Sequence, residues 1–260
     1  MSKDTLVSTE PVSQGIIAIT LARPDKRNAL SIALMEQLCA AIETAETEPA
    51  TRVLILRGAG PVFCAGLDLV EASDAQKVSR SAHLVARSLK TLRQSRLISI
   101  AAVHGEAVAG GAGLITACDL VVLEQDARIG YPEVHRGLVA ALVSKLLCAQ
   151  VPERIARELL LLGEMIDADR ARAIGLANRV VPSGCAFDEA TAMARQVLRG
   201  GPIAIVKTKQ LVNQHAPSQL AGDLELAEDE HLAMRRSAEA TEGLAAFFEK
   251  RPPNWTPKGK

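Results

Sequence analysis

Two glycine-bearing segments most constrain what this chain can fold into. Residues 63–69 and 109–114 each follow an apolar, β-rich run and lead into a helix-like pattern. Glycine lets the backbone approach a ligand without a Cβ atom, and the N–H groups at a helix start are unpaired and partly positive. Two such turns facing each other would form an oxyanion hole. A third segment, residues 129–134, places the Glu133 carboxylate after a proline turn, from which it can project into a cleft. Together the segments indicate chemistry on a carbonyl compound.

The length and composition are those of a globular protein with a large core. The 260 residues are 48% hydrophobic and 23% charged, which favours a large α/β domain, residues 1–199, followed by a helical segment, residues 200–260. Thirty basic and thirty acidic residues give a formal net charge of zero, so no global field would attract nucleic acid or an anionic membrane. We therefore expect neither of these as a partner.

The cysteines and the N-terminus indicate a cytoplasmic location. The five cysteines are odd in number, widely spaced and mostly embedded in apolar runs, and they form no C-x-x-C pair for zinc or redox chemistry. We expect reduced, buried thiols and no metal site. The N-terminus lacks the apolar region of a signal peptide, and no stretch of about 18 apolar residues could span a bilayer.

Strand-like and helix-like segments alternate in the first part of the chain. Short aliphatic runs bounded by glycine or proline predict strands at residues 15–21, 53–56, 98–103 and 120–123. Apolar residues at helical spacing predict one helix capped by Ser31 and a shorter helix at residues 112–117. Strands that alternate with crossover helices imply an α/β fold with mostly parallel pairing.

The chain after residue 140 has a helical pattern. Helices are predicted at residues 142–149, 153–162, 168–174 and 187–199, and from 203 to about 250. Common catalytic signatures are missing: there is no G-x-S-x-G, no H-E-x-x-H and no G-x-x-x-x-G-K-[ST] motif. The histidines show no ligand-like pairing, so we expect them to be structural or to face solvent. His135 is the exception, because it lies two residues from Glu133.

Several motifs, in order and with matching spacing, resemble the enoyl-CoA hydratase/isomerase (crotonase) family. They are residues 25–30 (DKRNAL), 63–69 (FCAGLDL), 105–113 (GEAVAGGAG), 118–119 (CD), 132–134 (PEV), 137–138 (GL), 173–182 (AIGLANRVVP) and 242–251 (EGLAAFFEKR). The resemblance runs from about residue 10 to about residue 251. It implies an α/β spiral of β-β-α units with a C-terminal helical trimerisation region, assembled as a homotrimer or as a hexamer of two trimers. It also implies an acyl-CoA substrate, of which coenzyme A is a part, and no separate cofactor.

The resemblance assigns roles to residues of the three segments. The backbone N–H groups of Leu67 and Gly110 would hold the thioester oxygen of an enolate, and Gly111 would keep their turn tight. Glu133 matches the family's second catalytic glutamate. A carboxylate in a mostly apolar acyl pocket would have its pKa raised towards neutrality, which suits proton exchange with carbon or water. Gly113 occupies the position of the first glutamate of many relatives.

The resemblance also implies contacts with coenzyme A, and several of the residues concerned have a structural alternative. The residues concerned are Lys26, Arg27, Ala29, Cys64, Ala65, Gly66, Asp68, Gly111, Phe247 and Lys250. Lys26 and Arg27 could instead be solvated turn residues, and Cys64 a core thiol. Asp68 is expected chiefly to cap a helix at residues 69–75. Phe247 could belong to an amphipathic helix that docks on the core.

The missing first glutamate leaves three functions open. Residues 110–114, Glu133 and residues 137–144 resemble methylglutaconyl-CoA hydratase-like bacterial members, which also carry glycine at that position. Reversible hydration of a 2-enoyl-CoA is therefore the first prediction. A single-glutamate 3,2-enoyl-CoA isomerase is the alternative enzyme, and a weakly catalytic acyl-CoA-binding protein is the alternative of another class. Glu106 and Glu124 are further carboxylates, but nothing in the sequence places them near Glu133.

Overall fold

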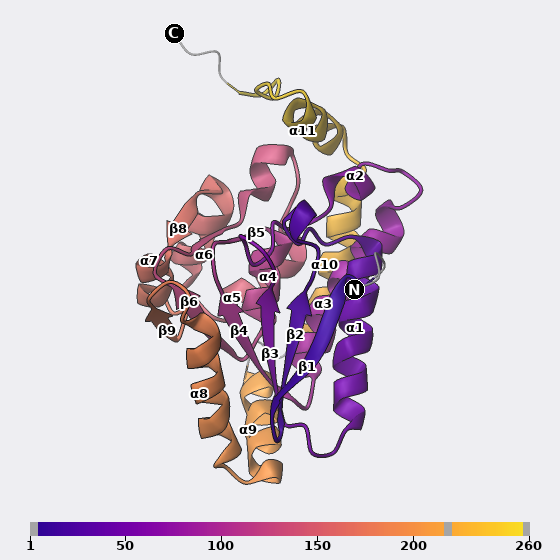
Figure 1. The fold of residues 1–260 in the computed structure, drawn as a ribbon. Coiled ribbons are helices and arrows are strands. Elements are labelled where there is room, and N and C mark those ends of the chain that lie inside the picture. Colours follow the sequence, from indigo (N-terminus) through magenta and orange to yellow (C-terminus); the bar gives the residue numbers. More distant parts are fainter. Residues whose placement is uncertain (1–4, 216–219, 257–260) are drawn as a thin grey trace.

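The fold is built around a mainly parallel sheet with helices packed on both sides (Figure 1), in a computed structural model that describes residues 5–215 and 220–256. The sheet contains, in spatial order, β1 (Val7–Ser13), β2 (Ile16–Leu21), β3 (Val53–Gly58), β4 (Ile98–Val103), β6 (Leu120–Glu124) and β9 (Arg179–Val181). Strand β1 is antiparallel to β2, and every other neighbouring pair is parallel. The predicted α/β class with mostly parallel pairing is confirmed.

Side chains of the central strands alternate between two apolar layers. In β3, Leu54 and Leu56 belong to one hydrophobic cluster, and Val53 and Ile55 belong to the other. Helices α1 (Ile32–Thr47), α3 (Val78–Gln94) and α4 (Gly110–Ala117) contribute to the first cluster, and α8 (Ala186–Leu198) contributes to the second. Burial on both faces explains why these strands read as continuous apolar runs.

The sequence patterns missed several short or polar elements. Strand β1 contains Pro11 and a run of three polar residues, and it lies at a sheet edge, where proline is tolerated. A second, three-stranded sheet joins β5 (Glu106–Val108), β7 (Arg128–Gly130) and β8 (Met165–Asp167). Each of these strands has three residues, too few to show a period in the sequence. Helix α3 was also not predicted.

The remaining helices match the predicted ones closely. They are α5 (Ala141–Cys148), α6 (Glu153–Leu162), α7 (Ala168–Ala173), α9 (Pro202–His215), α10 (Leu220–Arg235) and α11 (Ala238–Phe248). The helical pattern predicted from residue 203 to about 250 is confirmed in the described residues, which divide it among α9, α10 and α11. The last of these helices begins at Ala238. Ser237 starts it, with its hydroxyl accepting a hydrogen bond from the Ala240 N–H at 3.0 Å. In the described part of the chain, no helix combines the length and apolar content needed to cross a bilayer.

The expectation that the cysteines are buried is only partly correct. All five thiols are free, and Cys39, Cys64 and Cys118 are buried. Cys148 and Cys185 are exposed. Both lie at helix ends, one closing α5 and the other preceding α8. An apolar sequence neighbourhood does not bury a side chain where the helix ends at the surface.

Candidate active site

Two loops that leave adjacent parallel strands meet at one end of the sheet. Strands β3 and β4 pair in parallel, so the chain segments after their carboxyl ends emerge side by side. The Cys64 N–H donates to the Glu106 carbonyl at 3.1 Å, and the Val108 N–H donates to the Cys64 carbonyl at 3.0 Å. These bonds fix the first glycine-bearing loop against β5 and the start of α4.

The contact between the loops is too close for side chains at two positions. A Cβ on Gly66, which has a φ of +89°, would lie 2.7 Å from the Val108 carbonyl oxygen. A Cβ on Gly111 would lie 2.4 Å from the Cys64 carbonyl oxygen. Only glycine fits such an approach, and Gly66 also needs glycine for its backbone conformation.

The contact brings two unpaired backbone donors together. A Cβ on Gly110 would lie 3.9 Å from the Leu67 nitrogen, so the two peptide groups are neighbours. Among the described residues, neither the Leu67 nor the Gly110 N–H has a protein acceptor. Gly110 is the first residue of α4, where N–H groups lack partners within the helix. Ala109 before it is held at a φ of +51°, a conformation that non-glycine residues rarely adopt.

The Asn28 side chain is hydrogen-bonded to the segment that leads into the first glycine-bearing loop. Its Nδ2 donates to the carbonyl oxygens of Ala59, Val62 and Phe63, at 2.8, 2.9 and 3.1 Å. Its Oδ1 accepts from the Arg23 N–H at 3.0 Å. The side chain is completely buried and its φ is +55°, which asparagine tolerates better than most residues. This residue shapes the turn that leads to Leu67.

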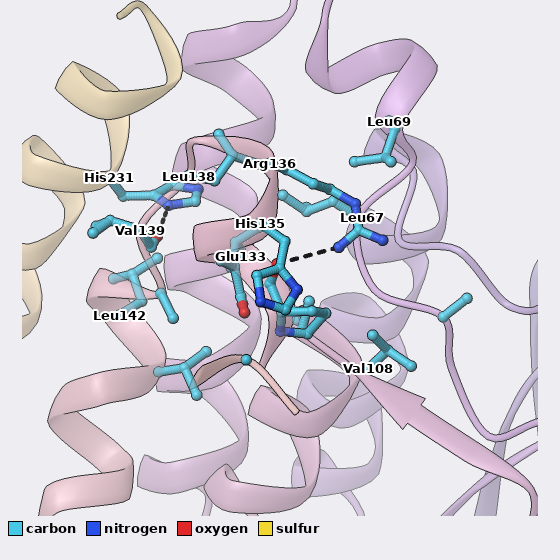
Figure 2. Close-up of a pocket in the computed structure, with 18 of the residues that line it drawn as sticks. Leu67, Leu69, Val108, Glu133, His135, Arg136, Leu138, Val139, Leu142 and His231 are labelled. Carbon is cyan, nitrogen blue, oxygen red and sulfur yellow. Dashed lines mark hydrogen bonds between the residues drawn. The ribbon is translucent and has the colours of Figure 1, made fainter. Parts of the chain in front are cut away.

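A cavity of about 610 Å³ opens beside the two N–H groups (Figure 2). Much of its wall is apolar and comes from residues 138–143 together with Leu67, Leu69, Val85 and Val108. The polar side chains in the wall are Arg27, Glu106, Glu133, His135, Arg136 and His231. An acyl chain would suit the apolar part, and a polar head group the remainder.

Glu133 is the carboxylate at the centre of this cavity. It lies in the short 3₁₀ helix η2 (Pro132–Arg136), and Figure 2 shows its side chain pointing into the space between the labelled apolar residues. Its Oε2 is buried and has no hydrogen-bond partner. Burial raises the pKa of Glu133 to about 7, against smaller opposing effects of its own backbone N–H and of Arg136. The predicted shift towards neutrality is confirmed.

Helix α11 fixes η2 in place through close backbone packing. A Cβ on Gly137 would lie 2.4 Å from the Glu239 carbonyl oxygen, and a Cβ on Gly243 would lie 2.2 Å from that of Arg136. The Arg136 guanidinium lies 4.8 Å from the centre of the Phe247 ring, a cation–π contact. Helix α11 therefore packs against η2 and also contributes Phe247 to the cavity wall.

There is no space for a side chain at position 113, where many relatives carry the first glutamate. Gly113 is buried, does not line the cavity, and faces the side chains of Val143 and Leu89. Glu106 does line the cavity, which no sequence pattern predicted, and it forms an ion pair with Arg27. Glu124 is buried elsewhere, with Oε1 3.5 Å from the Ala186 nitrogen. Glu133 is thus the one unpaired carboxylate among the described residues of the wall.

The structure gathers part of the predicted set around the cavity. Arg27, Ala65, Leu67, Gly110, Glu133 and Phe247 line it. Lys26, Ala29, Cys64, Gly66, Asp68, Gly111, Gly113 and Lys250 do not. Lys26 and Lys250 are exposed at the surface, and their proposed contacts with coenzyme A stay predictions.

Two of these residues have clear structural roles. The Cys64 thiol donates to the Asn28 carbonyl at 3.1 Å, and burial raises its pKa to about 12. Asp68 caps α2 (Leu69–Ala72) through bonds from the Val70 and Glu71 N–H groups. Although partial burial opposes the shift, Arg23, whose Nη1 donates to Asp68 at 2.7 Å, helps lower the Asp68 pKa.

Besides Glu106, two polar residues of the wall were not predicted from the sequence, Arg136 and His231. Arg136 lies within η2, and His231 comes from α10, far along the chain from the other site residues. No motif marks either residue, so only the packing of α10 and α11 could reveal them. The described residues contain no group of three or more His, Cys, Asp or Glu side chains that could hold a metal ion.

Known proteins match this chain over nearly its whole length. The family model for enoyl-CoA hydratase/isomerase matches residues 11–258. A Thermus thermophilus protein named "Putative enoyl-CoA hydratase" is 39% identical over 94% of this chain and 99% of its own. The 2,3-dehydroadipyl-CoA hydratase of Escherichia coli is 31% identical over 93% of this chain and 95% of its own.

A solved structure shows the same architecture. The crystal structure of an enoyl-CoA hydratase from Mycobacterium avium has a TM-score of 0.87 and 33% identity, covering 97% of this chain and 99% of its own. The spatial match agrees with the order of motifs in the sequence and with the two loops that meet at the cavity. The chain therefore belongs to the enoyl-CoA hydratase/isomerase family and has the crotonase fold.

Proposed function

We propose that this protein catalyses the reversible addition of water to a 2-enoyl-CoA. The observation that carries the proposal is the placement of Glu133 in the same cavity as the Leu67 and Gly110 N–H groups, with its Oε2 buried and unpaired among the described residues. Relatives named as hydratases support it. The cavity wall also suits an acyl chain, because it is mainly apolar.

The two backbone N–H groups would form the oxyanion hole. When water attacks C3 of the enoyl group, the C2–C3 π electrons move towards the thioester and negative charge builds on its oxygen. Donors already fixed at that oxygen stabilise this charge without rearranging, and each is worth about 10²–10³ in rate. The Leu67 and Gly110 groups meet this requirement because close glycine packing holds them in place and no protein acceptor competes for them.

Glu133 would carry the proton in both halves of the addition. Its carboxylate accepts a proton from the attacking water while the hydroxyl bonds to C3. The resulting carboxylic acid then donates that proton to C2 as the enolate collapses, so one water is added and the carboxylate is regenerated. A pKa of about 7 lets Glu133 do both near neutral pH.

The lone carboxylate keeps one alternative reaction open. Moving a proton between C4 and C2 of a 3-enoyl-CoA needs only one acid/base group, so Glu133 could also serve a 3,2-isomerase. A relative from Mycosarcoma maydis is named an enoyl-CoA isomerase/hydratase. A weakly catalytic acyl-CoA-binding protein has less support, because binding would not need a carboxylate buried without a partner.

Turnover in oxygen-labelled water tests these alternatives. Crotonyl-CoA and a 3-enoyl-CoA are incubated separately with the protein, and the products are weighed by mass spectrometry. The proposal expects a 3-hydroxyacyl-CoA that carries the solvent label. Conversion of the 3-enoyl substrate without labelled hydroxyacyl-CoA would establish the isomerase, and binding without turnover of either substrate would establish the binding protein.

We also infer a homotrimer or a hexamer of two trimers in the cytoplasm. Helix α9 exposes Ile203, Leu211 and Val212, which are 78%, 57% and 61% accessible. Exposed apolar side chains gathered on one element are typical of a subunit interface. All five cysteines are free thiols, which suits the reducing environment of the cytoplasm. Sedimentation of the purified protein measures the subunit number directly.

A further inference from the structure

One buried polar side chain of the cavity has no part in the proposed chemistry. Glu133 handles the proton, Arg27 and Glu106 pair with each other, and Arg136 lies over the Phe247 ring. His135 is exposed, so His231 remains. It is 7% exposed, lines the cavity, and has a buried Nε2 with no hydrogen-bond partner among the described residues.

The hydrogen bond at Nδ1 determines whether Nε2 of His231 can donate or accept a hydrogen bond. Its Nδ1 lies 3.4 Å from the Val139 carbonyl oxygen, and Figure 2 shows the ring held above Val139 as it reaches in from α10. A carbonyl oxygen only accepts hydrogen bonds, so Nδ1 carries the proton in this arrangement. Nε2 then carries no proton, so it can only accept a hydrogen bond.

The charge state agrees with that assignment. Burial lowers the pKa of His231 to about 4, and Arg235, one helical turn further along α10, lowers it in the same direction. The imidazole is therefore neutral near pH 7, and its free nitrogen stays an acceptor. A carboxylate on the ligand offers only lone pairs and could not satisfy it, whereas a hydroxyl could.

We propose that His231 Nε2 accepts a hydrogen bond from a hydroxyl group on the acyl chain of the substrate, away from the thioester. The proposal rests on the acyl-CoA assignment of the cavity, and it names the substrate class as hydroxylated acyl-CoA thioesters. A plain hydrocarbon chain covers the buried acceptor without pairing it, which is unfavourable. A site built to bind a hydroxyl discriminates strongly against the analogue that lacks it.

Affinities of unreactive thioesters test the proposal without requiring turnover. Isothermal titration calorimetry compares hexanoyl-CoA with its 4-, 5- and 6-hydroxy derivatives and with adipyl-CoA, whose chain ends in a carboxylate. The wild-type protein should bind one hydroxy derivative about ten- to a hundredfold more tightly than hexanoyl-CoA. Equal affinity for all hydroxy derivatives and hexanoyl-CoA, or tightest binding of adipyl-CoA, would overturn the proposal.

Two substitutions test whether the preference for a hydroxy derivative depends on Nε2 of His231. His231→Phe keeps an aromatic ring and removes the acceptor, so the preference for the hydroxy derivative should fall to about onefold while hexanoyl-CoA binds at least as well. His135→Phe is the matched control, because His135 also lines the cavity but is exposed. It should retain the preference, and circular dichroism checks that both variants fold. A preference that survives His231→Phe overturns the proposal.

The result for His231 can be distinguished from the result for the hydratase assignment, because the two use different measurements. Labelled-water turnover of crotonyl-CoA reports on hydration, and the affinity ratio reports on His231. A protein that hydrates crotonyl-CoA and shows no hydroxyl preference retains the proposed function and loses this inference. A protein that binds the hydroxy derivative preferentially without hydrating any substrate retains the inference and loses the function.

Discussion

Gly113 lies directly against Val143: a Cβ built on Gly113 would be 2.8 Å from Val143 Cγ2 and 3.6 Å from Leu89 Cδ2. The position that resembles the first glutamate of other family members is therefore filled from the opposite side by an apolar residue of α5. The Val143 side chain fills the space that a side chain at position 113 would need. The packing of the core therefore excludes a carboxylate at this position. A glutamate could not be restored here by one substitution.

Gly113→Glu should accordingly destabilise the protein without adding activity. A larger side chain forced into a packed core destabilises by about 1–3 kcal/mol, and a buried carboxylate adds to this. Urea unfolding of the single variant, of Val143→Ala and of the double variant measures the coupling. The double variant should be more stable than the sum of the two single effects predicts. Simple additivity would contradict the contact between the two positions.

Glu133→Gln should separate chemistry from binding. The amide keeps the shape of the side chain but cannot accept the proton, so turnover should fall by about 10²–10⁴. Affinity for a saturated acyl-CoA, measured by calorimetry, should change little. Glu106→Gln is the matched control, because Glu106 lines the same cavity but pairs with Arg27. A larger loss of turnover in that control would reassign the base.

The raised pKa of Glu133 predicts how activity depends on pH. Since the carboxylate form accepts the proton from water, kcat/KM should rise with pH through a midpoint near 7, the pKa to which burial raises Glu133. The midpoint should be absent from the residual activity of Glu133→Gln. A wild-type profile that is flat between pH 5 and 8 would contradict this role.

Stability should depend on the same group in the opposite direction. The carboxyl is harder to ionise in the folded protein, at about 7, than at its ordinary 4.5, so its stabilising effect is complete below 4.5 and is lost as pH rises to 7. Glu133→Gln avoids this loss. The melting temperature of the variant relative to wild type should therefore increase from pH 4.5 to pH 8, which calorimetry at both values tests.

The Gly110 N–H can be tested against a variant that keeps it. Gly110→Ala retains the N–H and adds a Cβ 3.0 Å from Leu30 Cδ1, so it reports the effect of crowding alone. Gly110→Pro removes the N–H, and turnover should fall a further 10²–10³, roughly the value of one oxyanion donor. Both variants need the circular dichroism spectrum of the wild type. Equal turnover in the two folded variants would exclude this donor.

Asn28 should matter to stability more than any other turn residue near it. Asn28→Ala leaves two buried and one partly buried carbonyl group without their donor, and we expect a loss of about 2–3 kcal/mol in urea unfolding. Turnover should also fall, because the loop that carries Leu67 loses its support. Asp25→Ala, an exposed change in the same turn, is the control and should stay within about 0.5 kcal/mol.

Local patterns in the sequence were enough to predict four strands of the main sheet and most of the helices. Aliphatic runs predicted β2, β3, β4 and β6, because strands buried on both faces need continuous apolar side chains. Ser31 marks the start of α1, where its hydroxyl accepts the Leu34 N–H at 3.2 Å. The closeness of Leu67 to Gly110 was also predictable, from glycine-rich motifs in the order of a known family.

Tertiary structure alone decided how the rest of the cavity is made. The burial that raises the Glu133 pKa, the ion pair of Glu106 with Arg27, and the unpaired Nε2 of His231 all depend on residues far apart in the chain. Neither the 3.6-residue nor the 2-residue period carries such information, because each reports only which face of an element is buried. What that face meets is decided when α10 packs on α3 and α5 and when α11 packs on η2. This packing brings His231 and Phe247 to the apolar pocket.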